Sequence, residues 1–449
     1  MKKFLPLASL IILAAFSVFL LIVYGCGSNP TGGGSSADIS TEGAEAMGGC
    51  NIITISHSTI LGMGATSSKT ITGKVREIVS GNPIANVLVM APSSTTGYVS
   101  TETGSNGSYS LSGVKTGTIG VTIVHNDYHA LSIACDADEV YFNLFPRNQV
   151  SSLSKDCTLE AYIYRSDNSP ASSNAGINLV CIKDSLIAGY GDSVSQGHHS
   201  QATVISGTTV YFLGTETDIG SSSLMSASLD PAEIKTVAIT LEAEVGTVRA
   251  TLIPPTSFGS IYNSSTDLAT KIPNSYCWLQ VNQGLNESGT TYRVKAPPGN
   301  YKFIAGCNTN ECLSFYQEKI NSLSNGITIE MGSINLMECP TLSPPDTGTP
   351  TPVLSFSSVE AADLYLVQVW EEGVVGTGWM GITSSTSIEF PPIPSSYDQS
   401  IKTGTTYVYY LYAYKFPEDV NVNNFDFAEV LDGDQRHTSK NETTFTTSF

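Results

Sequence analysis

Two close pairs of histidines are the first candidates for metal chemistry in this sequence. In His125-Asn-Asp-Tyr-His129 the two imidazoles stand four residues apart, which is the spacing found on a zinc-binding helix. The glutamate that follows the first histidine on such a helix, and acts as the base, is absent here. The second pair, His198-His199, stands in a Gly/Ser-rich loop. Because a catalytic zinc needs three protein ligands, we expect neither a metal nor another cofactor.

A serine is the second candidate for chemistry. The run Tyr-Gly-Asp-Ser-Val-Ser-Gln-Gly around Ser193 resembles the nucleophile block of GDSL-type esterases. The resemblance implies that a distant Asp-x-x-His pair activates Ser193 and that Gly-x-Asn supplies oxyanion donors. The matching residues downstream are Asn286, Asp434 and His437. That enzyme fold alternates strands with helices, whereas residues 200–340 show the Thr/Ser/Val pattern of strands, so a surface loop is preferred and the esterase is the alternative.

The N-terminal segment has the three parts of a secretory signal. Two lysines open it, an apolar run follows, and Gly25 precedes Cys26. These last residues resemble a lipobox, which implies removal of residues 1–25 and attachment of lipid to the Cys26 sulfur. The alternative is an uncleaved anchor, because the apolar run is near the length of a membrane span. A Gly/Ser-rich tether is expected over 26–68, and the absence of aspartate at Gly27 favours the outer membrane.

The cysteines predict disulfides. Nine are present, and removal of the lipidated one leaves an even number in an oxidising compartment. The close pair Cys307 and Cys312 has no flanking histidine, so a local bridge is preferred to a metal site. A bridge between Cys135 and Cys157 is the second prediction.

Composition limits the partners and the fold class. The formal net charge is −19, so the chain repels phosphate backbones, and nucleic acid is excluded as a partner. Anionic lipid would repel it too, so the lipid rather than a basic patch must hold it at the membrane. Charged residues make up 14% of the chain, and no long amphipathic helical stretch is present. We expect an all-β protein built from tandem β-sandwich domains.

Residues 69–146 carry the clearest strand pattern. Apolar residues alternate over 71–75 and again over 87–91, and Asn106-Gly107 is a strong signal for a hairpin. The order of strands and turns resembles the carboxypeptidase regulatory-like (transthyretin-like) domain, which implies a β-sandwich. The resemblance implies little about function, because such modules are accessory domains on many unrelated proteins.

Two further sandwiches are predicted over 147–245 and 246–339. The three units begin about 88 residues apart, a period that fits one sandwich each. Residues 294–301 of the third unit, Val-Lys-Ala-Pro-Pro-Gly-Asn-Tyr, match the Pro-Gly-x-Tyr strand of the same family. Residues 340–352 are rich in proline and predict a linker.

Residues 353–449 resemble a fibronectin type III domain. Tyr407 matches the tyrosine corner of that family, which implies that its hydroxyl is tied to the backbone. Phe356 stands where the family usually has tryptophan.

The last domain also carries an aromatic stripe. The two-residue period of a strand places residues 407, 409, 411 and 413 on one face, which the family pattern buries. An outward face then follows on this strand and on its neighbour, made of Tyr410, Tyr412, Tyr414 and Trp370. Such a patch favours contact with glycan or protein, and the alternative is that it packs on an adjacent domain.

These patterns favour a non-enzymatic lipoprotein of the cell envelope that binds or spaces through its sandwiches. The partner would be a glycan or another envelope protein. The alternative from a different class is a lipid-anchored esterase that uses Ser193.

Overall fold

The computed structural model describes residues 67–417 and 437–449, except for residues 79, 145, 148–154, 184–185, 190, 217–218, 243–244, 259–262, 274, 276, 310–311 and 375–377. The predicted signal peptide, Cys26, most of the tether and Asp434 lie outside the described residues. Every element within the described ranges is a β-strand, and the strands form several sheets, so the predicted all-β class of tandem sandwiches is confirmed. That part of the chain holds no helix of the length and apolar character needed to cross a membrane.

The strands fall into four units along the chain. The first unit contains β1 (Ser68–Glu77), β2 (Leu88–Pro92), β3 (Tyr98–Glu102), β4 (Ser108–Lys115), β5 (Ile119–Val124), β6 (Ala130–Cys135) and β7 (Phe142–Leu144). The second contains β8 (Lys155–Tyr164), β9 (Ala175–Lys183), β10 (Leu186–Gly189), β11 (Asp192–Gln196), β12 (His199–Ile205), β13 (Thr209–Glu216), β14 (Ser221–Ser228) and β15 (Ile234–Thr240). The third contains β16 (Gly246–Ile253), β17 (Asn263–Lys271), β18 (Trp278–Gln283), β19 (Leu285–Ser288), β20 (Thr291–Ala296), β21 (Gly299–Asn308), β22 (Cys312–Leu323) and β23 (Thr328–Asn335). The C-terminal unit contains β24 (Val353–Ser355), β25 (Leu364–Glu371), β26 (Gly378–Thr383), β27 (Ser387–Glu389), β28 (Thr406–Lys415) and β29 (His437–Thr446).

The first three units share one strand order. In one sheet of each unit, the opening strand (β1, β8 or β16) lies between an antiparallel neighbour (β4, β12 or β20) and a parallel one (β7, β15 or β23). In the other sheet the order is β6-β5-β2-β3, β14-β13-β9-β10 and β22-β21-β17-β18, respectively. The internal repeat expected from the spacing of the opening strands is therefore present in the topology.

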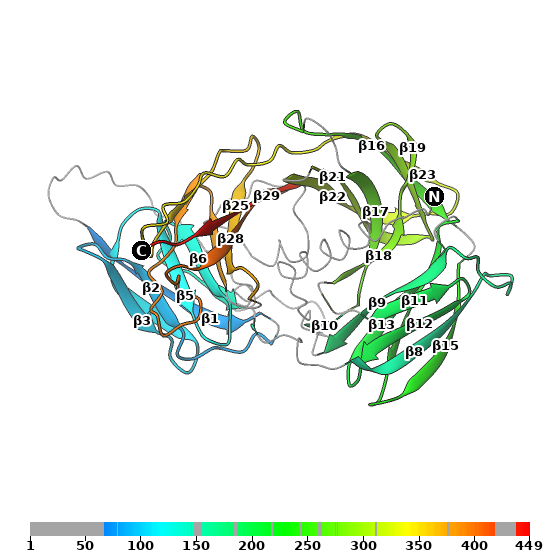
Figure 1. The fold of residues 1–449 in the computed structure, drawn as a ribbon, viewed down its shortest axis with the longest axis horizontal. Coiled ribbons are helices and arrows are strands. Elements are labelled where there is room, and N and C mark those ends of the chain that lie inside the picture. Colours follow the sequence, from blue (N-terminus) through cyan, green and yellow to red (C-terminus); the bar gives the residue numbers. More distant parts are fainter. Residues whose placement is uncertain are drawn as a thin grey trace, which may run out of the picture.

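One sheet runs through three of the units. Its twelve strands have the order β18-β17-β21-β22-β29-β28-β25-β26-β6-β5-β2-β3. The C-terminal unit supplies the middle four, with β29 antiparallel to β22 of the third unit and β26 parallel to β6 of the first. In Figure 1 the orange and red strands accordingly lie between the blue-cyan first unit and the yellow-green third unit. The last unit of the chain is thus in the middle of the molecule.

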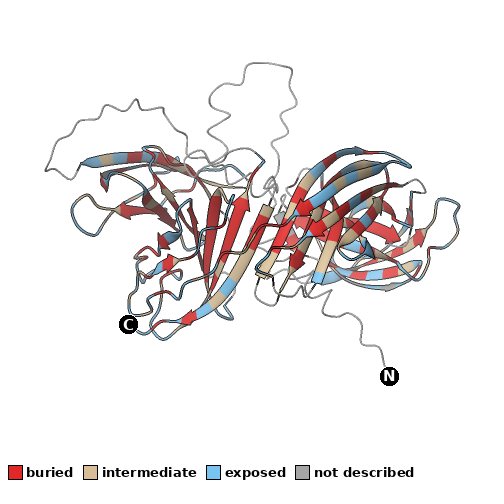
Figure 2. Ribbon diagram, turned by 90° about the horizontal axis from the view of Figure 1, so that it is seen from above, coloured by how far each residue is buried: buried red, intermediate tan, exposed pale blue. Residues whose placement is uncertain are grey.

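Alternating side chains build the cores, which are the red stretches in Figure 2. On β8, for example, Leu159, Ala161 and Ile163 are fully buried, and the residues between them are partly exposed. The core of the second unit lies between its own two sheets. The core of the third unit also takes in three residues from the outer face of the second, namely Val180, Ile182 and Leu213.

The predicted hairpin at Asn106-Gly107 is wrong in its pairing. The turn is tight, since the Gly107 amide donates to the Gly104 carbonyl at 2.9 Å. However, β3 and β4 on either side of it belong to different sheets. Gly107 has a φ of 75°, and a Cβ there would lie 2.5 Å from the Val75 carbonyl oxygen of β1. The glycine therefore lets the chain cross from one sheet to the other against β1.

Candidate functional site

The aromatic strand β28 divides its side chains between two faces, as predicted. Residues 407, 409, 411 and 413 lie in the core of the C-terminal unit. On the other face, Tyr412 and Tyr414 are 4% and 3% exposed and stack with ring centroids 6.0 Å apart and planes 7° apart. Both belong to the core of the first unit. The prediction that they form an exposed binding patch is therefore wrong, and the alternative, packing on an adjacent domain, is what the structure shows.

Strand pairing is the physical reason for this burial. Because β26 pairs with β6, the outward face of the C-terminal unit continues without a break into the inner face of the first unit. Leu366, Ile382 and Ile133 are consecutive neighbours across β25, β26 and β6, and all three lie in the same core. The C-terminal unit thus completes the core of the first unit.

The other two predicted binding residues, Trp370 and Tyr410, are half-buried, and Tyr410 packs against this core. The ring of Trp370 meets that of His129 of the first unit edge-on, with centroids 5.2 Å apart and planes at 74°. The ammonium of Lys440 lies 4.3 Å from the centroid of the Tyr410 ring. A cation therefore already covers one face of Tyr410, where a sugar would have to stack.

Sequence reasoning missed Trp379, the largest fully buried side chain among the described residues. Its indole N–H donates to the Ser132 hydroxyl of β6 at 2.7 Å, so a side-chain hydrogen bond crosses the junction inside the protein. The signal was present in the sequence, since β26 reads Gly-Trp-Met-Gly-Ile-Thr and is buried on both faces. A continuous apolar run of this kind predicts a strand covered on both sides.

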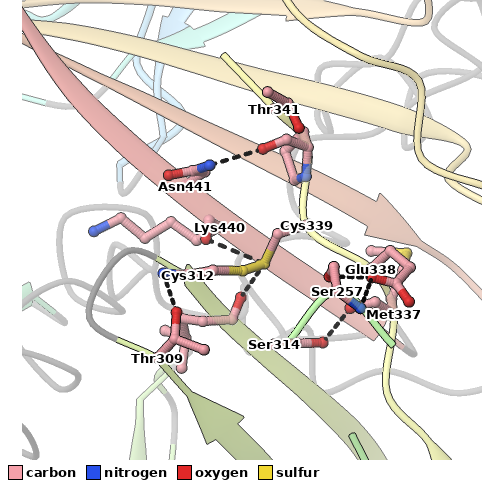
Figure 3. Close-up of a disulfide and its surroundings, with 12 residues drawn as sticks. Ser257, Thr309, Cys312, Ser314, Met337, Glu338, Cys339, Thr341, Lys440 and Asn441 are labelled. Atoms are coloured by element: carbon pink, nitrogen blue, oxygen red, sulfur yellow. Dashed lines mark hydrogen bonds between the residues drawn. A yellow bond between two sulfur atoms is a disulfide. The ribbon is translucent and has the colours of Figure 1, made fainter. Parts of the chain in front are cut away.

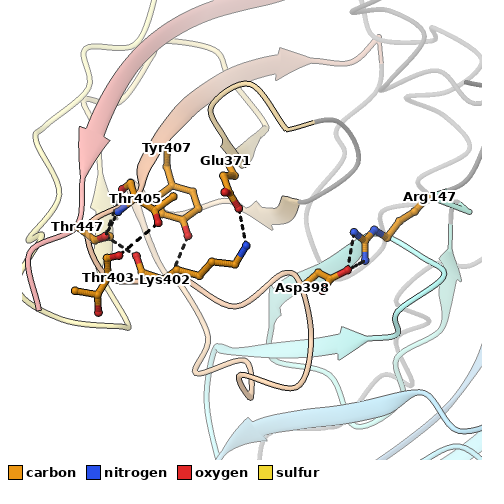
Figure 4. A network of polar contacts seen from close by, with 8 residues as sticks. All are labelled: Arg147, Glu371, Asp398, Lys402, Thr403, Thr405, Tyr407 and Thr447. Atoms are coloured by element: carbon orange, nitrogen blue, oxygen red, sulfur yellow. Dashed lines mark hydrogen bonds and ion pairs between the residues drawn. The ribbon is translucent and has the colours of Figure 1, made fainter.

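A loop of the C-terminal unit closes the same junction from one end. The Gln399 amide donates to the carbonyls of His125 and Tyr128 at 3.0 and 2.9 Å. Beside it, the Arg147 guanidinium lies 3.3 Å from the Asp398 carboxylate, as Figure 4 shows. Backbone groups of the first unit are thereby satisfied by side chains of the C-terminal unit.

The first pair of histidines considered as metal ligands, His125 and His129, lies at this junction. Burial lowers the pKa of His129 to about 4, and the positive charge of Arg147 adds to the effect. The Nδ1 of His125 accepts the Asp127 amide at 3.2 Å, within its own turn. Among the described residues, no group of three or more His, Cys, Asp or Glu side chains could hold a metal. Neutral His129 acts here as a packing residue.

The tie predicted for the tyrosine corner is present. The Lys402 backbone N–H donates to the Tyr407 hydroxyl at 2.8 Å, and the Lys402 ammonium donates to the Glu371 carboxylate at 2.7 Å (Figure 4). The Thr447 hydroxyl donates to the Lys402 carbonyl at 2.6 Å. This network fixes the loop before β28 against the end of the chain.

The three described residues of the esterase alternative lie in separate sheets. Ser193 lies on β11, where it is opposite Ala202, and Asn286 lies on β19 of the third unit. The Asn286 amide donates to the Gly289 carbonyl at 2.8 Å within its own turn, so it is not aimed at a substrate. His437 lies on β29 of the twelve-stranded sheet, with its ring 5.0 Å from that of Tyr316. The layers around these residues are sheets throughout the described part of the chain, which does not fit the esterase fold.

Both predicted disulfides are wrong. Cys312 is bonded to Cys339, with Cα atoms 6.3 Å apart, and Cys307 is a buried free thiol in the core of the third unit. Figure 3 shows how Cys339 reaches Cys312, since the segment after β23 passes over β22 and β29 at this point. The Ser314 hydroxyl donates to the Met337 carbonyl at 2.6 Å, which helps to hold that segment in place.

The second predicted bridge fails because its two cysteines belong to different cores. Cys135 lies in the core of the first unit, whereas Cys157 is a free thiol in the core of the second. The Cys157 thiol is 2.9 Å from the Asp230 carbonyl, to which it can donate.

Comparison with known proteins gives one family and several distant structures. No curated protein matches the chain. Among solved structures the chain is similar to the Bacillus anthracis TIE protein, at 12% sequence identity over 60% of this chain and 51% of that protein, with a TM-score of 0.17. The chain therefore spans about half of the TIE protein. It is also similar to a streptococcal ancillary pilin (10% identity, 60% of this chain, 99% of the pilin, TM-score 0.16) and to the chicken CNTN1 FN1–FN3 domains (12%, 54%, 84%, 0.15).

The family match falls on the first unit. Residues 70–139 match the carboxypeptidase regulatory-like domain, and this range lies within the 69–146 whose strand pattern resembles that family. The first unit of this chain thus matches the carboxypeptidase regulatory-like domain.

Proposed function

We propose that this chain is a non-enzymatic, lipid-anchored protein of the cell envelope that acts as a rigid spacer or holder. The observation that carries the proposal is the sheet shared by the first, third and C-terminal units. A partner of such a body would be a glycan or another envelope protein. Ser193, Asn286 and His437 lie on strands of three different sheets, so the esterase is not proposed.

Rigidity follows from the nature of the junctions. Units joined by small polar interfaces usually move relative to one another, and a large hydrophobic interface prevents this. Here the junction between the first and C-terminal units is a core, because Tyr412 and Tyr414 are buried among residues of β5 and β6. The C-terminal sheet also has both of its edges paired, by β22 and by β6, so it has no open edge of its own. Bending at either junction would break backbone hydrogen bonds and expose apolar side chains.

The envelope location rests on the lipobox resemblance at Cys26. Lipid on that residue would tether the sandwiches through a Gly/Ser-rich segment, and the acidic body would be repelled by anionic lipid rather than lie on it. A rigid body on a flexible tether can hold a partner at a distance from the membrane surface.

The test compares Cys26→Ala with Ser28→Ala, a matched change two residues beyond the expected cleavage site. We expect wild type and Ser28→Ala to fractionate with membranes as lipidated, processed protein. We expect Cys26→Ala to be soluble or to remain an unprocessed precursor. Lipidated membrane protein from Cys26→Ala would refute the anchor.

Two further measurements address the body itself. Small-angle scattering of residues 27–449 should fit one fixed arrangement of the described units, and a broad distribution of shapes would refute the rigid spacer. A fluorophosphonate probe should leave Ser193 unlabelled, and labelling that is lost in Ser193→Ala would restore the enzyme.

A further inference from the structure

The shared strand order of the first three units makes β6, β14 and β22 equivalent. Each is an outer strand of the sheet that does not contain the opening strand of its unit. Two of the three equivalent edges are paired: β6 with β26, and β22 with β29 of the C-terminal unit. In the described part of the chain, β14 of the second unit pairs with β13 alone, so its outer edge is open. The equivalent edge is therefore paired in the first and third units and, within the described residues, unpaired in the second.

The sequence of β14 lacks the usual protection of an open edge. Natural edge strands carry charges or proline, which prevent pairing with another chain. Strand β14 reads Ser-Ser-Ser-Leu-Met-Ser-Ala-Ser and has neither. The edge strands β3, β4, β11, β15 and β23 each carry a charged residue, whereas the short edge strands β7, β10 and β24 carry none. Strand β18 is also uncharged, but its Gln280 carbonyl accepts the Asn178 side chain of the second unit at 3.2 Å.

Only part of the outer edge of β14 is accessible to solvent. Ser221 and Ser222 are 3% and 5% exposed, so the start of β14 is closed off. Met225 is 36% exposed, and the serines that follow it are exposed. Residues 223–228 therefore form the accessible edge, with an apolar side chain near its middle.

We propose that β14 of one molecule pairs antiparallel with β14 of a second copy, across a twofold axis, to form a dimer. A twofold contact places a surface against itself, so the strand must tolerate its own side chains opposite it. Like charges opposite each other destabilise a strand pair, and in a chain of net charge −19 a charge-free strand avoids this repulsion. The antiparallel junction of β22 and β29 shows the geometry, with Ser314 opposite Ser439 and both side chains fully buried. The small serine side chains of β14 would allow two copies of the strand to approach each other as closely as β22 and β29 do.

Sedimentation velocity of residues 27–449, at about 1 to about 100 µM, tests the pairing. We expect a monomer–dimer equilibrium for the wild type. Met225→Lys should weaken it by at least about tenfold, because two lysines would meet near the twofold axis. The control is Ile234→Lys on the neighbouring edge strand β15, where the isoleucine is 67% exposed, and it should dimerise as the wild type does.

The alternatives give distinct outcomes. A wild type that stays monomeric over the whole range overturns the proposal, as does a dimer that both Met225→Lys and Ser226→Lys leave intact. If Met225→Lys lowers the melting temperature, Ser226→Lys, which changes an exposed side chain, decides the matter. Amide hydrogen exchange gives a second readout: protection over residues 223–228 should rise with protein concentration. No concentration dependence there, in a sample that dimerises, would place the contact elsewhere and refute the proposal.

Discussion

Replacement of Tyr412 by serine should destabilise the protein by an amount typical of a core residue. Its ring is 4% exposed, stacks on Tyr414, and lies in the core of the first unit although it belongs to the C-terminal unit. Removal of a buried aromatic side chain costs about 3–5 kcal/mol of unfolding free energy, of which the ring stacking accounts for about 0.5–1.5 kcal/mol. The serine hydroxyl would in addition lie beside apolar Leu366, its neighbour on β25, so we expect the upper half of that range.

Urea unfolding of residues 27–449 measures this cost, followed by tryptophan fluorescence. Trp379 lies at the same junction and therefore reports on it. Because the core is shared, the first and C-terminal units should lose stability together in one transition. The matched control is Val353→Ser on β24, a residue that is 49% exposed, and a surface change of this kind stays within about 0.5 kcal/mol.

A small effect would contradict the burial of this face. If Tyr412→Ser costs less than about 1 kcal/mol, the ring is accessible in solution and the shared core does not hold. Tyr410→Ser gives an internal comparison, because this ring is half-buried under Lys440 and should cost less than Tyr412→Ser. Equal costs for the two tyrosines would also count against the assigned burial.

Two further predictions concern pH and reduction. The pKa of His129 is lowered from 6.5 to about 4, so below pH 6.5 the unfolded chain binds a proton that the folded chain does not. The contribution of neutral His129 to the free energy of unfolding should therefore be fully present above pH 6.5, and it should fall by up to about 3 kcal/mol as the pH drops towards 4. Urea unfolding across this range should show a shallower fall for His129→Gln than for the wild type. Parallel curves for the two proteins would contradict the lowered pKa of His129. The Cys312–Cys339 bridge spans a sequence separation of 27 residues, so Cys339→Ser should cost about 3.5 kcal/mol by loop closure. Calorimetry of both proteins in oxidising and in reducing buffer checks this: the variant should be less stable than the wild type in oxidising buffer and equal to it in reducing buffer. A difference that persists in reducing buffer would point to an effect other than the bridge.

Local structure was predictable from the sequence because it depends on neighbouring residues. Alternation on β1 and β8 follows from short-range patterns, and it is present. The repeat expected from the spacing of the opening strands and the tie at Tyr407 implied by the fibronectin resemblance are also present. The two faces of β28 were also assigned correctly, since the period of a strand fixes them. What the period does not fix is which other surface covers the second face.

The errors on the disulfide and on the aromatic face concern contacts between residues far apart in sequence. Cys307 and Cys312 are close in the chain, but the segment after β23 returns over β22 and brings Cys339 to Cys312. The fibronectin-like pattern describes one sandwich by itself, so it predicts an exposed aromatic face. The pairing of β26 with β6 joins residues about 250 apart in sequence, and no local pattern specifies such a partner. The apolar character of β26 on both faces did indicate that a cover exists.

The C-terminal unit closes open sheet edges of two units that precede it in the chain. Along the twelve-stranded sheet, the C-terminal unit lies between the third and the first, although it comes last in the chain. Until residues 353–449 are in place, β6 and β22 both have open edges, and the apolar face of β6 that carries Leu131 and Ile133 lacks part of its cover. The C-terminal unit closes both edges at once, and its aromatic face fills the gap in the core of the first unit. The aromatic side chains are therefore explained by assembly within the chain, and the second unit is the one sandwich of the three whose equivalent edge, β14, stays open in the described structure.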